Sequence, residues 1–293
     1  MAVILVTGAD GQLGSELREA SKKYIGYKYI FTDKEELDLT DSEAIRQFIS
    51  SHKPDWIINC AAYNQVDKAE ADYDEAHTIN STAVGNIAKV IRDSPCHFIH
   101  ISTDYVYSGN GTQPFSEYSI PDPVNAYGKS KLEGEKNALL HPWTMVIRTS
   151  WLYSSYGNNF VLTILRLGKE KQELRVVNDQ TGTPTYAADL AEAILTIIMN
   201  VNRQQIAFNA GIYNYSNEGS CTWYDFALAV VEEAGLNCKV IPVSSEEYAS
   251  VARRPVFSVM NKGKIKENYQ LLLPHWRDSL KKCIRIIKKK IKK

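Results

Sequence analysis

Tyr127 and Lys131 are the pair of side chains in this sequence whose spacing most directly suggests chemistry. They lie four residues apart in a run of helix-forming residues for which Asn125 is a suitable cap, so a helix places both on one face, one turn apart. A nearby ammonium favours the phenolate and lowers the pKa of a tyrosine from its usual value of about 10. Tyr127 is therefore predicted to donate a proton near neutral pH, as the reduction of a ketone requires.

Two hydroxyl groups precede this helix at the end of a predicted strand. The apolar residues Phe98, Ile99 and Ile101 indicate the strand, and Ser102 and Thr103 follow at its end. Either hydroxyl is suited to hold the substrate oxygen. A Tyr-x-x-x-Lys pair also arises by chance on exposed helices, so its meaning depends on whether other parts of the chain bring a cofactor to it.

A glycine-rich turn near the N-terminus predicts a dinucleotide site. The apolar run 2–6 leads into Thr7-Gly8-Ala9-Asp10-Gly11-Gln12-Leu13-Gly14, and a helical pattern follows over 15–23. Glycines let backbone amides approach a pyrophosphate, and the helix N-terminus favours negative charge. The glycines are three residues apart, which departs from the standard Rossmann fingerprint and resembles the short-chain dehydrogenases/reductases.

The second predicted strand, 29–32, bears on the choice of cofactor. It ends at Asp33, a position suited to bind a hydroxyl of the adenosine ribose. Asp33 would repel the additional phosphate of NADP, whereas the neighbouring Lys34 would attract it. The sequence leaves NADH and NADPH open.

Strands and helices alternate along the first half of the chain, which predicts an α/β fold with a Rossmann-type doubly wound parallel sheet. Gly8, Ala61 and Thr103 each follow a predicted strand and should face one crevice at the carboxyl edge of the sheet. A helix over 41–51 is expected to begin with a capping box formed by Thr40 and Glu43. We expect residues 1–150 to form the dinucleotide-binding domain, with about 186–212 returning to it, and residues 151–293 to form mainly a smaller C-terminal substrate-binding domain.

Composition excludes several other classes of protein. The 34 basic and 34 acidic residues give no net charge, which argues against a nucleic-acid binder. No apolar run is long enough to span a membrane, and the N-terminal residues lack the basic region of a signal peptide. The five scattered cysteines match neither a disulfide framework nor a metal site, so we expect a cytoplasmic protein and name no metal ligand. The sequence leaves any metal dependence open. The sequence leaves the oligomeric state open, with a homodimer as one option.

Two basic segments in the second half of the chain each allow two interpretations. Arg253 and Arg254 would clamp a substrate phosphate or form surface salt bridges. The last predicted helix, from His275 onward, has one apolar stripe and many lysines. Such a helix lies on a membrane or docks on the protein with its lysines in water, and we favour docking.

These residues together make the sequence similar to the dTDP-4-dehydrorhamnose reductase family, an extended branch of the short-chain dehydrogenases/reductases. The resemblance covers essentially the whole chain. It rests on TGADGQLG at 7–14, AAYNQVDKAE at 61–70, STDYVYSGNG at 102–111, NAYGKSKLEGE at 125–135, RTSWLY at 148–153, GNNF at 157–160, NDQTGTPT at 178–185 and ARRP at 252–255.

The resemblance implies a role for each matching residue. Tyr127 would protonate the O4 atom of the sugar, Lys131 would hold the nicotinamide ribose and Thr103 would position the keto oxygen. Cofactor contacts are implied, besides Tyr127 and Lys131, at Gly8, Gly11, Gln12, Leu13, Asp38, Leu39, Ala61, Ala62 and Tyr63. Substrate contacts are implied at Val66, Thr103, Asp104, Tyr105, Trp151 and Arg253 or Arg254.

The implied activity is the reduction of dTDP-4-dehydro-L-rhamnose to dTDP-L-rhamnose with NADPH or NADH, the last step of dTDP-rhamnose biosynthesis. Related dehydratases carry a second acidic residue where this chain has Tyr105, so simple reduction is favoured over elimination of water. Two alternatives stay open. One is a reductase of another 4-keto sugar nucleotide. The other is a non-catalytic, cofactor-binding regulatory subunit like that of methionine adenosyltransferase, which resembles the same family.

Overall fold

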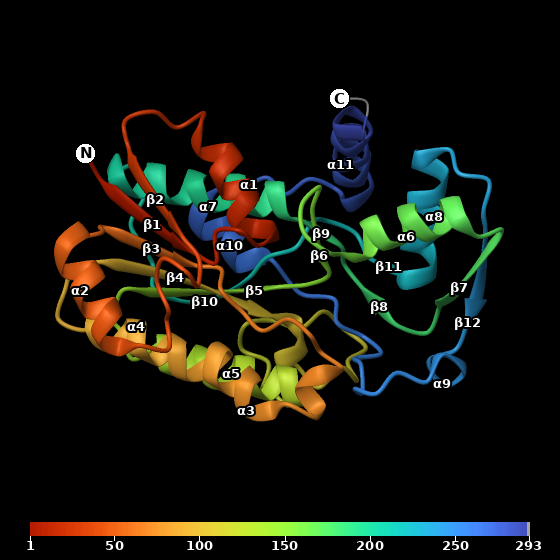
Figure 1. The fold of residues 1–293 in the computed structure, drawn as a ribbon, viewed down its shortest axis with the longest axis horizontal. Coiled ribbons are helices and arrows are strands. Elements are labelled where there is room, and N and C mark those ends of the chain that lie inside the picture. Colours follow the sequence, from red (N-terminus) through yellow and green to blue (C-terminus); the bar gives the residue numbers. More distant parts are fainter. Residues whose placement is uncertain (292–293) are drawn as a thin grey trace.

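The computed structural model describes residues 1–291, and its largest element is a six-stranded parallel sheet (Figure 1). The strand order is β10-β5-β4-β3-β1-β2, so the chain runs outward from β1 to β2 and then crosses to the other side of β1. The Rossmann-type, doubly wound α/β fold is therefore confirmed. The strands are β1 (Val3–Thr7), β2 (Lys28–Thr32), β3 (Trp56–Asn59), β4 (His97–Thr103), β5 (Thr144–Thr149) and β10 (Gly211–Asn214).

Helices cover both faces of this sheet (Figure 1). Ile4 and Val6 of β1 pack in one hydrophobic core, whereas Leu5 between them packs in another on the opposite face. This explains why the strand is apolar at every position, since a strand covered on both faces has no solvent side. One face carries α1 (Gln12–Ser21), α7 (Ala187–Asn202) and α10 (Gly263–Tyr269), and the other carries α2 (Ser42–His52), α4 (Ala83–Val90) and α5 (Ala126–Ala138).

The approach to α4 contains a π-helical turn. A short 3-10 turn, η1 (Lys68–Glu70), precedes α3 (Tyr73–His77), and η2 (Thr78–Thr82) joins α3 to α4. Asn80 of this turn is fully buried, and its side chain bonds both backbone groups of Tyr63 and the hydroxyl of Ser130 on α5. The π turn thereby ties the segment after β3 to the helix that carries Tyr127 and Lys131.

A second hydrophobic core lies beyond β5 and is built by three helices and short strands. The helices are α6 (Phe160–Glu170), α8 (Trp223–Ala234) and α11 (Trp276–Ile291). Three small sheets complete this part, namely β6 (Leu152–Tyr153) with β9 (Thr185–Tyr186), β11 (Cys221–Thr222) with β8 (Thr181–Gly182), and β12 (Lys239–Val243) with β7 (Glu173–Val177). The short elements η3 (Asp104–Val106) and α9 (Ser245–Tyr248) lie in connecting segments.

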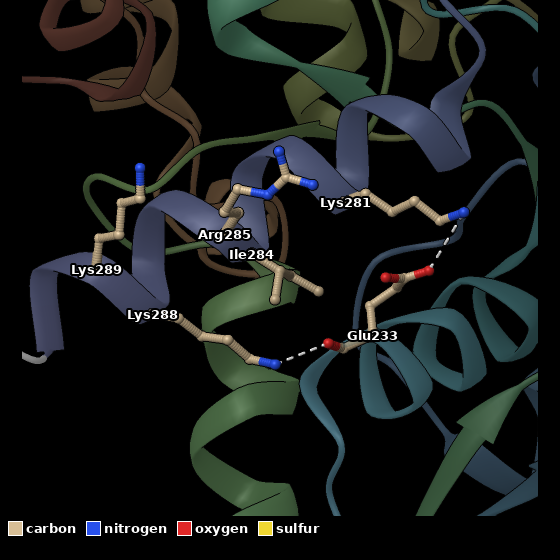
Figure 2. A pocket seen from close by; sticks show the side chains of 6 residues that line it. All are labelled: Glu233, Lys281, Ile284, Arg285, Lys288 and Lys289. Carbon is tan, nitrogen blue, oxygen red and sulfur yellow. Dashed lines mark hydrogen bonds and ion pairs between the residues drawn. The ribbon is translucent and has the colours of Figure 1, made fainter.

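The terminal helix α11 docks on the protein. Trp276, Leu280, Cys283, Ile284 and Ile287 are buried in the second core. Figure 2 shows how the adjoining basic face is tied to α8. Glu233 pairs with Lys281 at 3.7 Å, and its backbone carbonyl accepts a hydrogen bond from Lys288 at 3.0 Å. Because the apolar stripe is buried, the lysines of α11 are its solvent face. Within residues 1–291, no helix combines the length and apolar character needed to cross a bilayer.

The predicted capping box of α2 is wrong. Asp41 is the N-cap, and its carboxylate accepts hydrogen bonds from the amides of Glu43 and Ala44. Thr40 does not cap the helix because both its amide and its hydroxyl donate to Asp38, at 2.8 and 2.7 Å. Helix α1 also begins at Gln12, three residues earlier than the pattern indicated, so its first turn lies inside the glycine-rich segment.

A buried ion pair joins the helix of the Tyr127–Lys131 pair to the sheet. Arg148 on β5 donates two hydrogen bonds to Glu135 on α5, at 2.9 and 2.6 Å, and the two side chains are 1% and 2% exposed. The third guanidinium nitrogen donates to the hydroxyl of Tyr107, which in turn donates to Asn214 on β10. The pair therefore fixes α5 against β5 and β10.

Removing one partner should strongly destabilise the fold. The substitution Glu135→Ala leaves the guanidinium of Arg148 buried without a counter-ion, and we expect it to lower the free energy of unfolding by about 3–5 kcal/mol. The matched control is Glu170→Ala on α6, whose pair with Arg166 is exposed and should be worth at most about 1 kcal/mol. Urea unfolding of both variants measures the difference. Equal losses would contradict a structural role for the buried pair.

Candidate functional site

Two adjoining cavities lie at the carboxyl edge of the central sheet. The first, of about 470 Å³, holds Thr103, Tyr127 and Lys131 together with the glycine-rich turn. The second, of about 450 Å³, continues from the same turn toward the end of β2, and Gly8, Gly11 and Ala62 line both. The prediction that these strand ends face one crevice is thus confirmed.

The glycine-rich turn is shaped to accept a pyrophosphate. Gly8 has a φ of +65°, and a Cβ atom on it would lie 2.5 Å from the amide nitrogen of Ala61. The first turn of α1 carries no acidic residue, and Gly11 provides no side-chain cap, so the helix amides are available to an anion. Gln12 also lines the cavity, and its buried Oε1 atom has no hydrogen-bond partner among the described residues. This cradle fits a dinucleotide.

The second cavity has the groups expected around an adenosine ribose. Asp33, Lys34, Asp38 and Leu39 line it. The carboxylate of Asp33 accepts hydrogen bonds from the amides of Asp10, at 3.0 Å, and Lys34, at 2.8 Å. Hydrogen bonds from Thr40 lower the pKa of Asp38 and keep it ionised. Asp33 and Lys34 stand side by side at this cavity, so both cofactor preferences stay open.

Tyr127 is half-buried, and its surroundings correct one expectation. Burial raises the pKa of the phenol above its ordinary value, and the side chain of Thr103, by hydrogen bonding to it, acts in the opposite direction. The expected lowering of this pKa by Lys131 is not seen, and burial is the largest cause of the shift. The ammonium of Lys131 donates to the backbone carbonyl of Ile101 at 2.7 Å. Tyr127 is consequently protonated at neutral pH, which suits a proton donor.

Lys131 is 1% exposed, and burial lowers its pKa to about 8. Glu135, one turn further along α5, acts in the opposite direction and helps to keep the ammonium charged. The thiol of Cys60, directly after β3, and the imidazole of His100 on β4 both interact with the charge of Lys131. The charge on Lys131 is therefore sensitive to pH near neutrality.

Ser102 is not free to hold a substrate oxygen. It is buried, and its hydroxyl donates to Glu135 at 2.5 Å. Ser102 and Thr103 both line the cavity, but the hydroxyl of Thr103 makes longer hydrogen bonds than that of Ser102. Thr103 donates to Asp104 at 3.2 Å and accepts from the amide of Tyr105 at 3.2 Å.

Asp104 is an unusual carboxyl group in this site. It is 1% exposed, and burial raises its pKa to about 7 against the hydrogen bonds of Ser258 and Thr103. Its Oδ2 atom has no hydrogen-bond partner within residues 1–291. Asp104 therefore changes its protonation near neutral pH, beside Thr103 and Tyr127.

The remaining sequence-predicted residues divide into two groups. Val66, Tyr105, Trp151 and Arg254 line the first cavity, as do Leu13 and Ala62, and Ala61 lines the second. Tyr63 and Arg253 line neither. Tyr63 is buried among Ala69 and Ala76, and Arg253 is exposed. The sequence allowed the arginines either to bind a substrate phosphate or to form a salt bridge. Arg254 is placed for both, because it lines the cavity and forms an ion pair with Asp67 at 2.7 Å.

The structure adds lining residues that the sequence did not indicate. In the first cavity they are Cys60, Asn64, Ile101, Thr149, Ser150, Leu152, Gly157, Asn158, Asn159 and Trp223. Asn159 caps α6 and Trp223 begins α8, so both lie at helix starts. The sequence does not indicate that the N-termini of α6 and α8 approach the carboxyl edge of the sheet. Among the described residues, no group of three or more His, Cys, Asp or Glu side chains is arranged to hold a metal ion.

Comparisons with known proteins agree on one family. The family model described as RmlD substrate binding domain matches residues 1–289. The chain is 41% identical over 285 residues to the spore coat polysaccharide biosynthesis protein SpsK of Bacillus subtilis, covering 97% of each chain. It is 40% identical over 294 residues to dTDP-4-dehydrorhamnose reductase of Escherichia coli K12, covering 96% of each.

A solved structure gives the same result. The dTDP-4-dehydrorhamnose reductase of Bacillus anthracis, in complex with NADP, has a TM-score of 0.90 and 38% identity. The match covers 98% of this chain and 100% of that one.

The substitution Gly8→Ala tests the pyrophosphate cradle. A Cβ atom would clash with Ala61, so the turn must move, and we expect the affinity for NADPH to fall by roughly tenfold or more. Gly26→Ala is the control, because Gly26 also has a positive φ but a Cβ there meets nothing among the described residues within 4 Å. Fluorescence titration with NADPH compares the two. A similar affinity in both variants would contradict the cradle.

The substitution Asp104→Asn tests the buried carboxyl. The pKa is raised from 3.8 to about 7, so between these values the folded state holds a proton that the unfolded chain has lost. The contribution of Asp104 to the free energy of unfolding therefore falls as pH rises. We expect the stability of the wild type relative to the variant to decrease from about pH 4.5 to about pH 7 and then level off, measured by urea unfolding. A constant difference would show that the carboxyl titrates normally.

Proposed function

Because the chain belongs to the RmlD substrate binding domain family, we propose that it reduces the C4 keto group of dTDP-4-dehydro-L-rhamnose to give dTDP-L-rhamnose, using NADPH or NADH. One observation carries this function. Thr103, Tyr127 and Lys131 line a single cavity with the glycine-rich turn that fits a dinucleotide. Relatives that share more than a third of this sequence, over nearly its whole length, carry the name of this reductase.

The residues of the two cavities can each be given a part in holding the cofactor. The backbone amides around Gly8, Gly11, Gln12 and Leu13 would bind the pyrophosphate. Asp33, Asp38 and Leu39 would line the adenosine end, with Ala61 and Ala62 between. Lys131 would hold the nicotinamide ribose. When bound, the nicotinamide supplies the hydride that reduces C4.

Thr103 and Tyr127 would position and protonate the substrate oxygen. The hydroxyl of Thr103 would hold the keto oxygen in place, and the phenol of Tyr127 would give its proton to O4 as that oxygen gains charge. A raised pKa keeps the proton on Tyr127 until a stronger base, the developing alkoxide, is present. The ammonium of Lys131, one turn away, would stabilise the phenolate that remains.

The substrate side of the site fits reduction better than dehydration. Val66, Asp104, Tyr105, Trp151 and Arg254 line the cavity around the reacting hydroxyls. Elimination of water needs a second acid beside the first, and the residue after Asp104 is Tyr105, whose pKa burial raises to about 12. Arg254 supplies a positive charge suited to the diphosphate of a dTDP-sugar.

We further propose that residues 1–150, with about 186–212, bind the dinucleotide and that residues 151–293 mainly bind the sugar nucleotide. The cysteines within residues 1–291 are free, which supports a reducing, cytoplasmic location. A homodimer stays a prediction that sedimentation would test.

The substitution Tyr127→Phe tests the proton donor. It removes the hydroxyl and keeps the ring, so turnover should fall by at least about 100-fold while cofactor binding stays measurable. The matched control is Tyr118→Phe, at a side chain that is 85% exposed. The assay follows oxidation of NADPH or NADH in the presence of dTDP-4-dehydro-L-rhamnose.

Three outcomes of this assay would change the proposal. Unchanged turnover in the Tyr127 variant would remove that residue from its role. Turnover of other 4-keto sugar nucleotides alone would change the substrate. Cofactor binding by the wild type without turnover would favour a regulatory subunit.

A further inference from the structure

A loop from the second half of the chain contacts the first turn of α1. This segment, which we call the 154–159 loop, joins β6 to α6, and its residues Gly157, Asn158 and Asn159 line the first cavity. Gln12, the first residue of α1, lines the same cavity. A Cβ atom on Gly157 would lie 3.2 Å from the Cγ atom of Gln12, so the backbone of the loop packs on that side chain. The loop therefore meets the glycine-rich turn at the cavity.

One turn further along α1, a buried carboxyl group ties the same loop to the helix. Glu16 is 6% exposed, and Ser154 is fully buried. The hydroxyl of Ser154 donates to the Oε1 atom of Glu16 at 2.6 Å. Because residues four apart share one face of a helix, Gln12 and Glu16 present the same side of α1 to the loop. The loop is thus held at two successive turns of the helix that bears the pyrophosphate cradle.

The groups that satisfy Glu16 belong to the loop. Burial is the largest cause of the raised pKa of Glu16, because desolvation disfavours the charged carboxylate. Hydrogen bonds from the side chain of Ser154 and from the backbone of Ser155 lower this pKa and so favour the carboxylate. None of the catalytic or binding roles given above uses Glu16. Its side chain binds the loop, and this is the role that its burial points to.

The loop is braced internally between Ser154 and Gly157. The hydroxyl of Ser154 accepts a hydrogen bond from the amide of Tyr156 at 3.1 Å. The side-chain amide of Asn159 donates to the backbone carbonyls of Ser154, at 2.9 Å, and Tyr156, at 3.2 Å. Gly157, whose φ is +64°, lies between these braced residues. A displacement of Ser154 would therefore also displace Gly157 from Gln12.

The loop has a second anchor on α11. The ammonium of Lys290 donates to the hydroxyl of Ser155 at 3.0 Å and lies 3.3 Å from the centroid of the Tyr156 ring. This anchor does not involve α1. We therefore expect loss of the tie to Glu16 to shift the loop without unfolding it.

We propose that Glu16 is a positioning residue for the cofactor, which acts by holding the 154–159 loop against Gln12. The proposal rests on the dinucleotide binding that the proposed function requires, and it is independent of the identity of the sugar. The Oε1 atom of Gln12 is buried and has no hydrogen-bond partner among the described residues, so packing against the loop places this side chain. A side chain that is in place before the ligand arrives loses less conformational freedom on binding. Glu16 thereby raises the affinity of the pyrophosphate cradle without touching the cofactor.

Binding of NADPH to single and double variants tests this role. Glu16→Ala removes the acceptor of the tie and Ser154→Ala removes its donor, and we expect each variant to bind NADPH about fivefold more weakly or worse. The double variant should lose no more than the weaker single variant, because both substitutions break one interaction. Glu16→Gln keeps an oxygen that accepts from Ser154 and should stay within about twofold of the wild type. Fluorescence titration measures all four affinities.

Glu19→Ala is the matched control, because Glu19 lies on the same helix but is exposed and pairs with Lys22 at 2.8 Å. This control should bind NADPH as the wild type does. A control ligand is dTDP, which we expect every variant to bind as the wild type does. Thermal unfolding of the protein without ligand confirms that each variant is folded. If Glu16→Ala fails to fold, Ser154→Ala carries the test, because it keeps the carboxyl group.

The outcomes separate this inference from the proposed function. Folded Glu16→Ala and Ser154→Ala variants that bind NADPH as the wild type does overturn the inference. Equal weakening of NADPH and dTDP also overturns it, because Glu16 would then support the fold as a whole. Losses that add in the double variant, or a Glu16→Gln variant as weak as Glu16→Ala, overturn the tie to Ser154. Failure of the wild type to bind NADPH or NADH overturns the proposed function itself, and this is measured before any variant is made.

Discussion

The buried pair of Glu135 and Arg148 is the interaction on which the geometry of the site depends. The carboxylate of Glu135 accepts hydrogen bonds from the guanidinium of Arg148 and from the hydroxyl of Ser102. One side chain thereby connects α5, β4 and β5. Tyr127 and Lys131 lie eight and four residues before Glu135 on the same helical face. Any movement of Glu135 would move the phenol and the ammonium relative to Thr103. A charge pair this deep contributes little net stability but defines one arrangement, because each partner alone would be an uncompensated charge.

Burial determines the acid–base character of the site. It raises the pKa of Tyr127, lowers that of Lys131 to about 8 and raises that of Asp104 to about 7. In each case desolvation is the largest cause, and it disfavours the charged form. The sequence suggested a simpler picture, in which the ammonium of Lys131 directly lowers the pKa of the phenol. Burial instead raises the pKa of Tyr127, and the ammonium of Lys131 is bonded to the carbonyl of Ile101.

The features that the sequence correctly predicted are ones that depend on neighbouring residues, such as turns, helix caps and apolar stripes. The glycine-rich turn, the cap at Asn125 and the apolar stripe of α11 all appear as expected. The unpredicted features depend on partners far along the chain. Ser102 is occupied by Glu135, 33 residues away, and Arg254 rather than Arg253 reaches the cavity because Asp67, 187 residues away, holds it. Spacing within a segment carries no information about such contacts.

The residues that line the first cavity come both from the central sheet with α5 and from the second core. The sheet and α5 position Thr103, Tyr127 and Lys131, and the catalytic roles that we propose for these residues require a rigid geometry. Trp223, from α8, reaches the same cavity and stacks on Trp151, which directly follows β5. Two different parts of the fold therefore contribute side chains to one cavity. A substitution in the second core can alter the shape of this cavity while Thr103, Tyr127 and Lys131 stay in place, because those three residues lie on β4 and α5.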